Sequence, residues 1–464
     1  MPLARLVLCC ALSLIALLAS AQGLPPEVEA ALARAKLPRD ALSVVVVDAD
    51  GRAPPRLSHR ADEPVSPASI AKLATTFAAL ELLGPAFTWS TPVYVDGPVR
   101  DGTLYGNLYI KGQGDPDLVA ERLWLLLRRV QGLGIRSITG DIVLDRSAFD
   151  AGTQDPSAFD GEPLRPYNAA PDALLLNFKA LVMTFTPQGG QARVHLEPPL
   201  AGVALPVGVP LSGGECNDWR GALRADFSDA QRVRFAGTYP LACGEKTWPV
   251  AYVDPRSYAA RAVEGMWQQI GGKLTGQVRE GRVPEALAPA FELSSPPLAE
   301  IIRDINKFSN NVMAQQVFLT LGLQRGGGGT FEAARVVMQQ WWRERFGGEP
   351  PTFGNGSGLS REERITPAQL ARLLQAAWAS PLMPELISSL PVSGMDGTMR
   401  RMRGNTVGLA HLKTGSLRDV LGVAGYVQGA SGKRYVLVAI ANHPQAHAAR
   451  PAIEALIEWV ARDS

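Results

Sequence analysis

A predicted helix between residues 66 and 83 constrains the fold of this chain more than any other segment. Its sequence is apolar almost all round, which is typical of a helix buried in a core. Ser66 suits the N-cap, Pro67 suits the first helical position, and Gly84 is a strong stop signal. Lys72 lies inside this apolar stretch, where a cation is costly to bury. We therefore expect a core helix whose lysine either has a function or extends to solvent.

Ser69 and Lys72 form the pattern S-x-x-K, which places both side chains on one face of a helix. The backbone N–H of a serine in the first turn is unpaired, and the positive helix end favours the oxyanion of acyl transfer. A lysine removed from water favours its neutral form, so it can act as a general base for the serine. The pattern alone is weak, because many helices contain it by chance.

A second motif, Ser309-Asn310-Asn311, falls where two predicted helices are interrupted. Short polar side chains at such a break can point into a cleft. The alternative is simple helix capping, for which serine and asparagine are favoured.

A third motif, Lys413-Thr414-Gly415, stands at the start of a predicted pair of terminal strands. The lysine could bind a carboxylate, the threonine could hydrogen-bond it, and the glycine would let a substrate backbone approach closely. The alternative is an edge-strand lysine.

The three motifs occur together and in order, which is more specific than any one of them. S-x-x-K, S-D-N and K-T-G are the joint signature of β-lactamases and penicillin-binding proteins, and here the middle residue of the second motif is Asn310. The chain resembles the low-molecular-mass class C penicillin-binding proteins, the D-alanyl-D-alanine carboxypeptidase/endopeptidases of the DacB type. The resemblance covers essentially the whole mature chain and includes the stretches "LYIKGQGDPDL", "GDIVLDRSAFD", "NGSGLSREERITP" and "PVSGMDGTMRR".

This resemblance implies an α+β fold with a β-lactamase/transpeptidase-like domain that is split in sequence. Ser309 lies 240 residues after Ser69, so the intervening chain must loop out if both residues are to meet one substrate. The expected parts are a catalytic domain (22–90 and 287–464), an inserted α/β domain II (91–176 and 252–286) and a small nested β-rich domain III (177–251).

The resemblance also implies roles for the motif residues in acyl transfer. Ser69 would attack the carbonyl of the penultimate D-alanine of a peptidoglycan stem peptide, and Lys72 would take its proton. Ser309 would relay a proton to the leaving amine, and Asn311 would orient Lys72 and the substrate amide. β-Lactams would acylate the same serine by mimicking the D-Ala-D-Ala end.

The third motif would hold the other end of the substrate. Lys413 and Thr414 would bind the terminal carboxylate, with Gly415 leaving room for the substrate backbone. Backbone N–H groups of Ser69 and Ser416 would form the oxyanion hole. No cofactor is implied.

One position departs from the family's pattern, and the match of a second, acidic position is ambiguous. Asn355 stands where the family usually has an aspartate, which puts one local interaction in doubt. The family often places an acidic residue near a tyrosine to meet the free amine of the stem peptide's diamino acid. Tyr167 matches that tyrosine, and Glu162 or Asp160 is then the candidate acid, unless these are solvated loop residues.

The first 21 residues are typical of a secretory signal. A short apolar run, Leu6 to Leu18, precedes the small-residue cleavage site at Ala19–Ala21. This predicts export to the periplasm with cleavage after Ala21, and a retained anchor is the alternative. A homodimer and peripheral contact with a membrane are both compatible with the sequence.

Removal of the signal leaves two cysteines, Cys216 and Cys243. An even pair in an exported chain predicts a disulfide, with two free thiols as the alternative.

Several other functions are disfavoured. The net charge of +2 gives no support for nucleic-acid binding. His443 and His447 are spaced i, i+4, but Pro444 lies between them and no glutamate motif accompanies them, so we expect no metal site.

Two rivals remain. A β-lactamase would need a base such as the glutamate of E-x-x-L-N, and Ala173 occupies that position. A non-catalytic peptidoglycan-binding protein would not need the intact motif residues. Turnover of a D-Ala-D-Ala peptide separates it from an enzyme.

Overall fold

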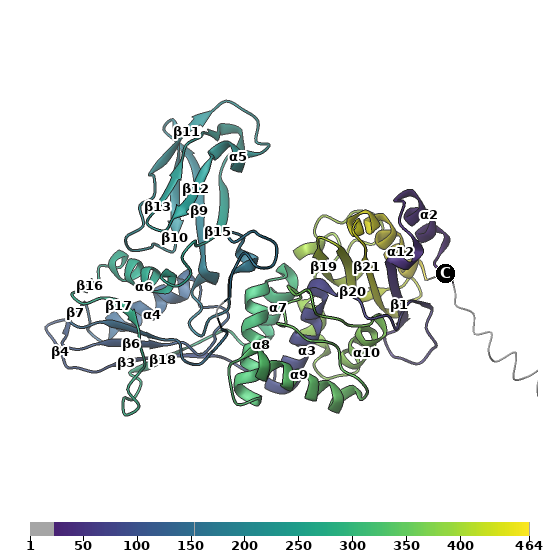
Figure 1. Ribbon diagram of the computed structural model, residues 1–464, viewed down its shortest axis with the longest axis horizontal. Helices are drawn as coiled ribbons and strands as arrows, with labels where there is room; N and C mark the ends of the chain where they lie inside the picture. Colours follow the sequence, from purple (N-terminus) through teal and green to yellow (C-terminus); the bar gives the residue numbers. More distant parts are fainter. Residues whose placement is uncertain (1–22, 153, 464) are drawn as a thin grey trace, which may run out of the picture. The chain divides into compact units, whose positions relative to one another are not determined.

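The computed structural model describes residues 23–152 and 154–463, and the chain divides into two compact units (Figure 1). The first unit comprises the residues up to Ile70 together with those from Glu363 onward. The second unit is Ala71–Glu362. The boundary between the units falls inside the S-x-x-K motif. The predicted signal peptide, residues 1–21, lies outside the described residues.

The first unit is built on an antiparallel sheet with the order β19-β20-β21-β1-β2. An N-terminal strand completes a C-terminal meander here, since Leu42 of β1 pairs with Ala441 of β21. The strands are β1 (Leu42–Asp48), β2 (Leu57–His59), β19 (Ala410–Leu417), β20 (Val420–Gln428) and β21 (Arg434–Asn442).

Helices cover both faces of this sheet, so β20 and β21 are buried on both sides. On one face, Val423 and Val427 pack in the same apolar cluster as Leu456 of α12. On the other face, the Tyr426 hydroxyl donates to the Leu374 carbonyl of α10 at 2.7 Å. The helices of this unit are α2 (Pro26–Arg34), α10 (Pro367–Trp378), α11 (Met383–Ser389) and α12 (Arg450–Arg462).

The predicted start of the nucleophile helix is wrong. A 3₁₀ turn, η2 (Ala68–Ala71), comes first, and the α-helix α3 (Lys72–Leu83) follows it. Ser66 does not cap the helix, because its backbone N–H donates to Asn442 Oδ1 at 2.9 Å and its carbonyl accepts from Asn442 Nδ2. Ala68 has φ +48°, a left-handed conformation that turns the chain just before Ser69. A tertiary contact therefore replaces the local cap.

In the second unit, α3 is the buried helix that the apolar pattern predicts, and every residue from Lys72 to Leu80 is buried. It contacts three helices: α7 (Leu298–Phe308), α8 (Asn311–Arg325) and α9 (Phe331–Phe346). The predicted break between two helices is confirmed at Ser309, which has φ +59°. The predicted stop is confirmed as well, with Gly84 as the C-cap of α3 at φ +86°.

The rest of the second unit contains a mixed α/β part. Its larger sheet has the order β17-β8-β6-β3-β18 and its smaller one the order β16-β7-β5-β4. The helices α4 (Ala120–Gly132) and α6 (Tyr258–Gln269) pack on each other. The strands are β3 (Ser90–Val95), β4 (Val99–Arg100), β5 (Thr103–Leu104), β6 (Leu108–Lys111), β7 (Ser137–Ile138), β8 (Ile142–Asp145), β16 (Lys273–Leu274), β17 (Val278–Glu280) and β18 (Phe291–Ser294).

A separate set of strands lies within residues 177–251, where the sequence predicts a nested β-rich domain. The sheet order is β14-β11-β10-β9-β15, beside the hairpin β12-β13 and the short helix α5 (Trp219–Leu223). The predicted disulfide is confirmed between Cys216 and Cys243, with an S–S distance of 2.03 Å. The strands are β9 (Ala180–Gln188), β10 (Gln191–Glu197), β11 (Gly208–Ser212), β12 (Ala225–Asp229), β13 (Arg232–Phe235), β14 (Tyr239–Pro240) and β15 (Lys246–Ala251). The boundaries of the three domains stay a prediction.

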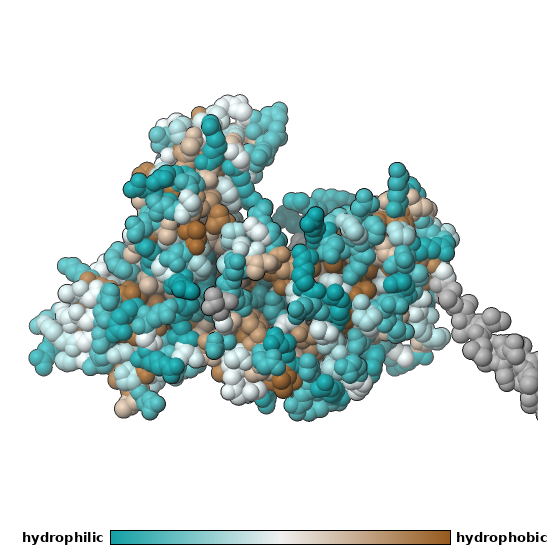
Figure 2. All heavy atoms as spheres, in the orientation of Figure 1, coloured by the Kyte–Doolittle hydropathy of each residue, from teal (hydrophilic) through white to brown (hydrophobic). Residues whose placement is uncertain are grey.

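The visible surface is mostly hydrophilic with scattered apolar patches (Figure 2), as the hydrophobic content of 46% would suggest for an ordinary globular chain. Within residues 23–152 and 154–463, no helix has the length and apolar character needed to cross a bilayer.

Candidate active site

Lys72 is the candidate residue of the second unit that has the most contacts to other motif residues and loops described below. Its side chain is fully buried at the first position of α3. The Nζ atom donates to Asn311 Oδ1 at 2.6 Å and to the carbonyl of Ser357. The two acceptors follow Lys72 in the sequence by 239 and 285 positions, so distant segments converge on its amine.

Two residues of the Ser309-Asn310-Asn311 motif have different contacts: Asn310 caps a helix and Asn311 contacts Lys72. Asn310 caps α8, since its Oδ1 accepts from the backbone N–H of Met313 at 3.1 Å. Asn311 instead contacts Lys72 through Oδ1 and donates from Nδ2 to the Tyr167 carbonyl at 3.2 Å. The two contacts fix the orientation of its amide. The capping alternative is therefore confirmed for Asn310, while a role of Asn311 in a cleft stays a prediction.

A loop that the sequence analysis did not connect to Lys72 supplies the second acceptor. The Ser357 carbonyl contacts Lys72, and the neighbouring Gly356 carbonyl accepts from Thr75 Oγ1 at 2.7 Å. Gly356 has φ +76°, and a Cβ there would lie 2.5 Å from the Phe318 ring. Only glycine fits, so the run "NGSG" was the signal that could have pointed to a tightly held loop.

Asn355, the departure from the family pattern, organises this loop. Its Oδ1 accepts from the backbone N–H of Ser357 at 3.1 Å and from its hydroxyl at 2.8 Å. Its Nδ2 donates to the Leu359 carbonyl at 3.0 Å. A carboxylate could make the first two contacts but could not donate the third. The amide is therefore a structural anchor suited to this turn.

The segment that carries the Tyr167 carbonyl is fixed to α8. Gln316 of α8 accepts from the Asp172 backbone N–H at 2.9 Å and donates to the Asp172 carbonyl at 2.8 Å. The Asp172 carboxylate pairs with Arg146 and with Lys179, whose Nζ is 2.9 Å away. Burial alone would raise the pKa of Asp172, but these two cations lower it below its usual value. The ionised network holds residues 167–172 beside Asn311.

The two candidate acids near Tyr167 differ in their contacts. Asp160 accepts from the Tyr167 hydroxyl at 2.9 Å and from Asn168 Nδ2 at 2.8 Å. Burial opposes ionisation, but these hydrogen bonds lower the pKa of Asp160 below its usual value. Glu162 is exposed and pairs with Arg165 at 3.3 Å. Asp160 is the acid that Tyr167 links to Asn311.

Ser69 lies in the first unit, in the turn η2. Gly415 of β19 packs directly against this turn. A Cβ at Gly415 would lie 2.7 Å from the Pro67 carbonyl oxygen and 3.2 Å from the Ile70 nitrogen. In this structure, the backbone that Gly415 accommodates is that of the turn η2, which carries Ser69.

Lys413 is fully buried on β19, although β19 is the last strand in the order of its sheet. Its Nζ donates to the Thr414 carbonyl at 2.8 Å, and burial lowers the pKa of Lys413 to about 7. Lys413 therefore lies on an edge strand, as the alternative interpretation has it, but its side chain is buried. An amine with this pKa can gain a proton when a carboxylate approaches.

Thr414 and Ser416 alternate with Lys413 and Gly415 along β19. The Thr414 hydroxyl donates to Thr398 Oγ1 at 2.8 Å. Thr414 and Ser416 line a cavity of about 540 Å³ that Arg401 also lines.

Ser69 and Lys72 are joined through the chain itself. Ser69 is the last residue but one of the N-terminal segment of the first unit, and Lys72 is the second residue of the second unit. Three peptide units keep their Cα atoms within about 11 Å of each other. Among the described residues, no group of His, Cys, Asp and Glu side chains could hold a metal ion.

Comparisons with known proteins agree with the three motifs. Residues 24–463 match the D-Ala-D-Ala carboxypeptidase 3 (S13) family. The chain is 29% identical to the D-alanyl-D-alanine carboxypeptidase of Actinomadura sp. strain R39, over 85% of this chain and 76% of the relative. It is 26% identical to the D-alanyl-D-alanine carboxypeptidase DacB of Haemophilus influenzae, over 81% and 80% of the two chains.

The fold agrees as well. The crystal structure of penicillin-binding protein 4 (dacB) from Haemophilus influenzae superposes with a TM-score of 0.74 at 22% identity, covering 93% of this chain and 98% of the other. Fold and motifs together define a serine peptidase, which is a hydrolase. The chain belongs to the D-Ala-D-Ala carboxypeptidase 3 (S13) family. The predicted family and the predicted α+β, transpeptidase-like fold class are thereby confirmed.

Proposed function

We propose that this chain is a D-alanyl-D-alanine carboxypeptidase that works through an acyl-enzyme on Ser69. The observation that carries the proposal is the fully buried Lys72, three residues after the serine and hydrogen-bonded to Asn311 at 2.6 Å. A lysine that is held in one position away from bulk water, three residues from the serine, is suited to the role of general base.

In the first step, Ser69 Oγ attacks the carbonyl carbon of the penultimate D-alanine while Lys72 Nζ takes the hydroxyl proton. The backbone N–H groups of Ser69 and Ser416 stabilise the oxyanion that forms. Asn311 holds the amine of Lys72 in position through Oδ1.

In the second step, the C–N bond breaks and Ser309 passes a proton to the departing D-alanine amine. Lys413 and Thr414 bind the terminal carboxylate of the substrate. The Lys413 pKa of about 7 supports this role, because the approaching carboxylate favours the protonated amine. Water then hydrolyses the acyl-enzyme and regenerates Ser69.

The substrate we propose is the peptidoglycan stem peptide, with Asp160 meeting the free amine of its diamino acid. The hydrogen bonds from Tyr167 and Asn168 keep the Asp160 carboxylate ionised, which supports this assignment over Glu162. We further propose endopeptidase activity on cross-links and export of the mature chain to the periplasm. Related folds in solved structures include a predatory peptidoglycan endopeptidase from Bdellovibrio bacteriovorus.

We also propose that β-lactams acylate Ser69, which one solved relative supports: penicillin-binding protein 4 from Haemophilus influenzae has a structure complexed with a β-lactam. The test is the intact mass of the purified mature chain after incubation with benzylpenicillin, beside a Ser69→Ala control. A stable adduct on the wild type alone is expected. No adduct with intact drug and no hydrolysis of a D-Ala-D-Ala peptide would contradict the proposal.

A β-lactamase is distinguished by the same experiment, since it would consume the drug quickly and leave no lasting adduct. The structure adds no acidic side chain at Ala173, where a deacylating glutamate would be needed.

A further inference from the structure

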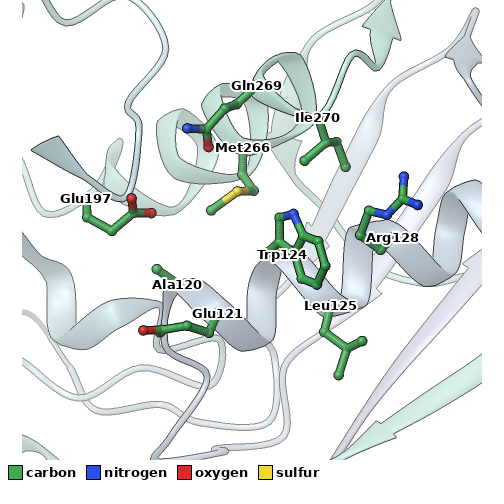
Figure 3. A pocket seen from close by; sticks show the side chains of 9 residues that line it. All are labelled: Ala120, Glu121, Trp124, Leu125, Arg128, Glu197, Met266, Gln269 and Ile270. Atoms are coloured by element: carbon green, nitrogen blue, oxygen red, sulfur yellow. The ribbon is translucent and has the colours of Figure 1, made fainter. Parts of the chain in front are cut away.

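The helices α4 and α6 enclose a groove of about 930 Å³ in the second unit (Figure 3). The groove takes no part in the chemistry described above. Its floor is apolar, with Trp124 and Leu125 from α4 and Met266 and Ile270 from α6. Glu121, Arg128, Glu197 and Gln269 add polar groups around this floor.

The helix α4 has more apolar surface than its core contacts use. Leu123, Leu126, Leu127 and Val130 are buried in the unit's core. On another face of the same helix, Trp124 and Leu125 keep 47% and 42% of their surface exposed. Exposed large apolar side chains that line one groove are typical of a binding surface.

The polar groups of the groove have spare hydrogen-bonding capacity. Within the described part of the chain, Glu121 forms no ion pair, and the indole N–H of Trp124 has no hydrogen-bond partner. The Glu197 carboxylate lies 3.4 Å from His195 Nε2. In Figure 3, Glu121 and Glu197 lie toward one end of the groove and Arg128 toward the other, with Trp124 between them.

The position of Glu197 relative to α6 is fixed by close backbone contacts. The Ala201 backbone N–H donates to the Arg261 carbonyl at 2.9 Å, and Arg261 Nη1 donates back to the Ala201 carbonyl. A Cβ on Gly265 would lie 2.3 Å from the Pro199 carbonyl oxygen, so the segment after Glu197 lies directly on the helix. The groove is thus a built feature of the second unit.

From these features we infer that the groove binds the glycan strand of peptidoglycan. This rests on the proposed function, in which the peptide substrate hangs from such a strand. The C–H face of a pyranose ring covers an indole, while its hydroxyls and amide groups point outward in the ring plane. Carboxylates, an amide and a guanidinium around Trp124 can accept from and donate to those groups. The methyl of an N-acetyl group packs on Met266 and Ile270.

The test uses the full mature chain and soluble glycan strands from which the stem peptides have been removed, with binding followed by titration calorimetry. Trp124→Ala should weaken binding about tenfold or more, as removal of an aromatic anchor does. Tyr105→Ala is the matched control, because Tyr105 is 55% exposed and does not line the groove. Glu197→Gln, which preserves shape, should weaken binding about fivefold.

Hydrolysis of a small sugar-free D-Ala-D-Ala peptide separates this inference from the proposed function. That rate should be the same in Trp124→Ala and in the wild type. A wild type that hydrolyses the peptide but does not bind the glycan, or a Trp124→Ala variant that binds it equally well, would overturn the inference alone. Loss of a dimer on Trp124→Ala, seen by sedimentation, would assign the groove to a second copy and overturn it as well.

Discussion

Lys72 Nζ lies 2.6 Å from Asn311 Oδ1, and this contact ties the first turn of α3 to the first turn of α8. The same asparagine is held from its other side by the Tyr167 carbonyl. An amide that is fixed at both ends presents its oxygen to the lysine in one orientation. The buried amine is thus positioned by neutral groups that come from two distant parts of the sequence.

Replacement of Asn311 should impair the chemistry more than the stability. Asn311→Ala removes the oxygen that positions Lys72, and we expect the rate of benzylpenicillin acylation to fall about a hundredfold. The neighbouring Asn310→Ala should do the reverse, since loss of an N-cap costs about 1 kcal/mol of stability and leaves the lysine untouched. Stopped-flow acylation and thermal melting of both variants measure the two effects. Equal acylation rates in the two variants would refute the assignment.

The pH dependence of substrate binding should report Lys413. Its pKa of about 7 means that the charged form is lost as the pH rises through 7. A carboxylate binds only the charged form well, so kcat/KM for a D-Ala-D-Ala peptide should decline above about pH 7. A peptide ending in D-alanine amide has no carboxylate and should lack this alkaline limb. Lys413→Arg keeps a cation and should move the limb to higher pH. If kcat/KM declined above pH 7 equally for both peptides, the titration of Lys413 would be excluded as the cause of the decline.

A methyl group at Gly415 should displace the turn that carries Ser69. The added Cβ would lie 2.7 Å from the Pro67 carbonyl oxygen. Relief of this contact requires a shift of the backbone of β19 or of the turn η2. We expect Gly415→Ala to lose about 1–3 kcal/mol of stability and most of its acylation rate. Gly132→Ala is the control, because a Cβ there meets nothing within 4 Å and its backbone is not left-handed. Wild-type acylation by Gly415→Ala would show that the turn tolerates the shift.

The second unit should become more stable on mild acidification because of a buried carboxyl group, Asp115. Burial raises its pKa to about 6, although the Asp117 backbone N–H and the charge of Arg122 oppose this. The folded state therefore binds the proton more tightly than the unfolded state. This stabilisation is complete below the usual value of 3.8 and is lost as the pH rises through about 6. Asp117 acts in the same direction. Its burial, together with the charge of Asp115, raises the pKa of Asp117 to about 6.

Asp115→Asn tests this dependence, because it keeps an acceptor for Asp117 and removes the charge. It should stabilise the second unit by about 2 kcal/mol at neutral pH. The free energy of unfolding should then change less with pH between pH 4 and 7. Urea unfolding at several pH values measures it, with the exposed Asp62→Asn as control. A variant that keeps the wild-type slope would place the titration elsewhere.

The sequence by itself determined the elements whose signals are local. The apolar stretch after Ser69 became the buried helix α3, and the polar break became the turn at Ser309. The even cysteine pair became a disulfide, and the three ordered motifs indicated the family. Periodicity and turn residues are properties of short segments, and the order of the three motifs follows directly from the sequence. A single sequence without aligned homologues is therefore enough to recognise them.

Only the tertiary structure decided what depends on partners far along the chain. Asn442 takes the backbone groups of Ser66 and delays the helix start to Lys72. The Ser357 carbonyl, 285 positions from Lys72, accepts a hydrogen bond from the amine. Asp160 is distinguished from Glu162 by Tyr167, whose carbonyl contacts Asn311. Each outcome depends on hydrogen bonds between side chains and backbone groups that come together only when the chain folds. Local sequence propensity therefore cannot predict them.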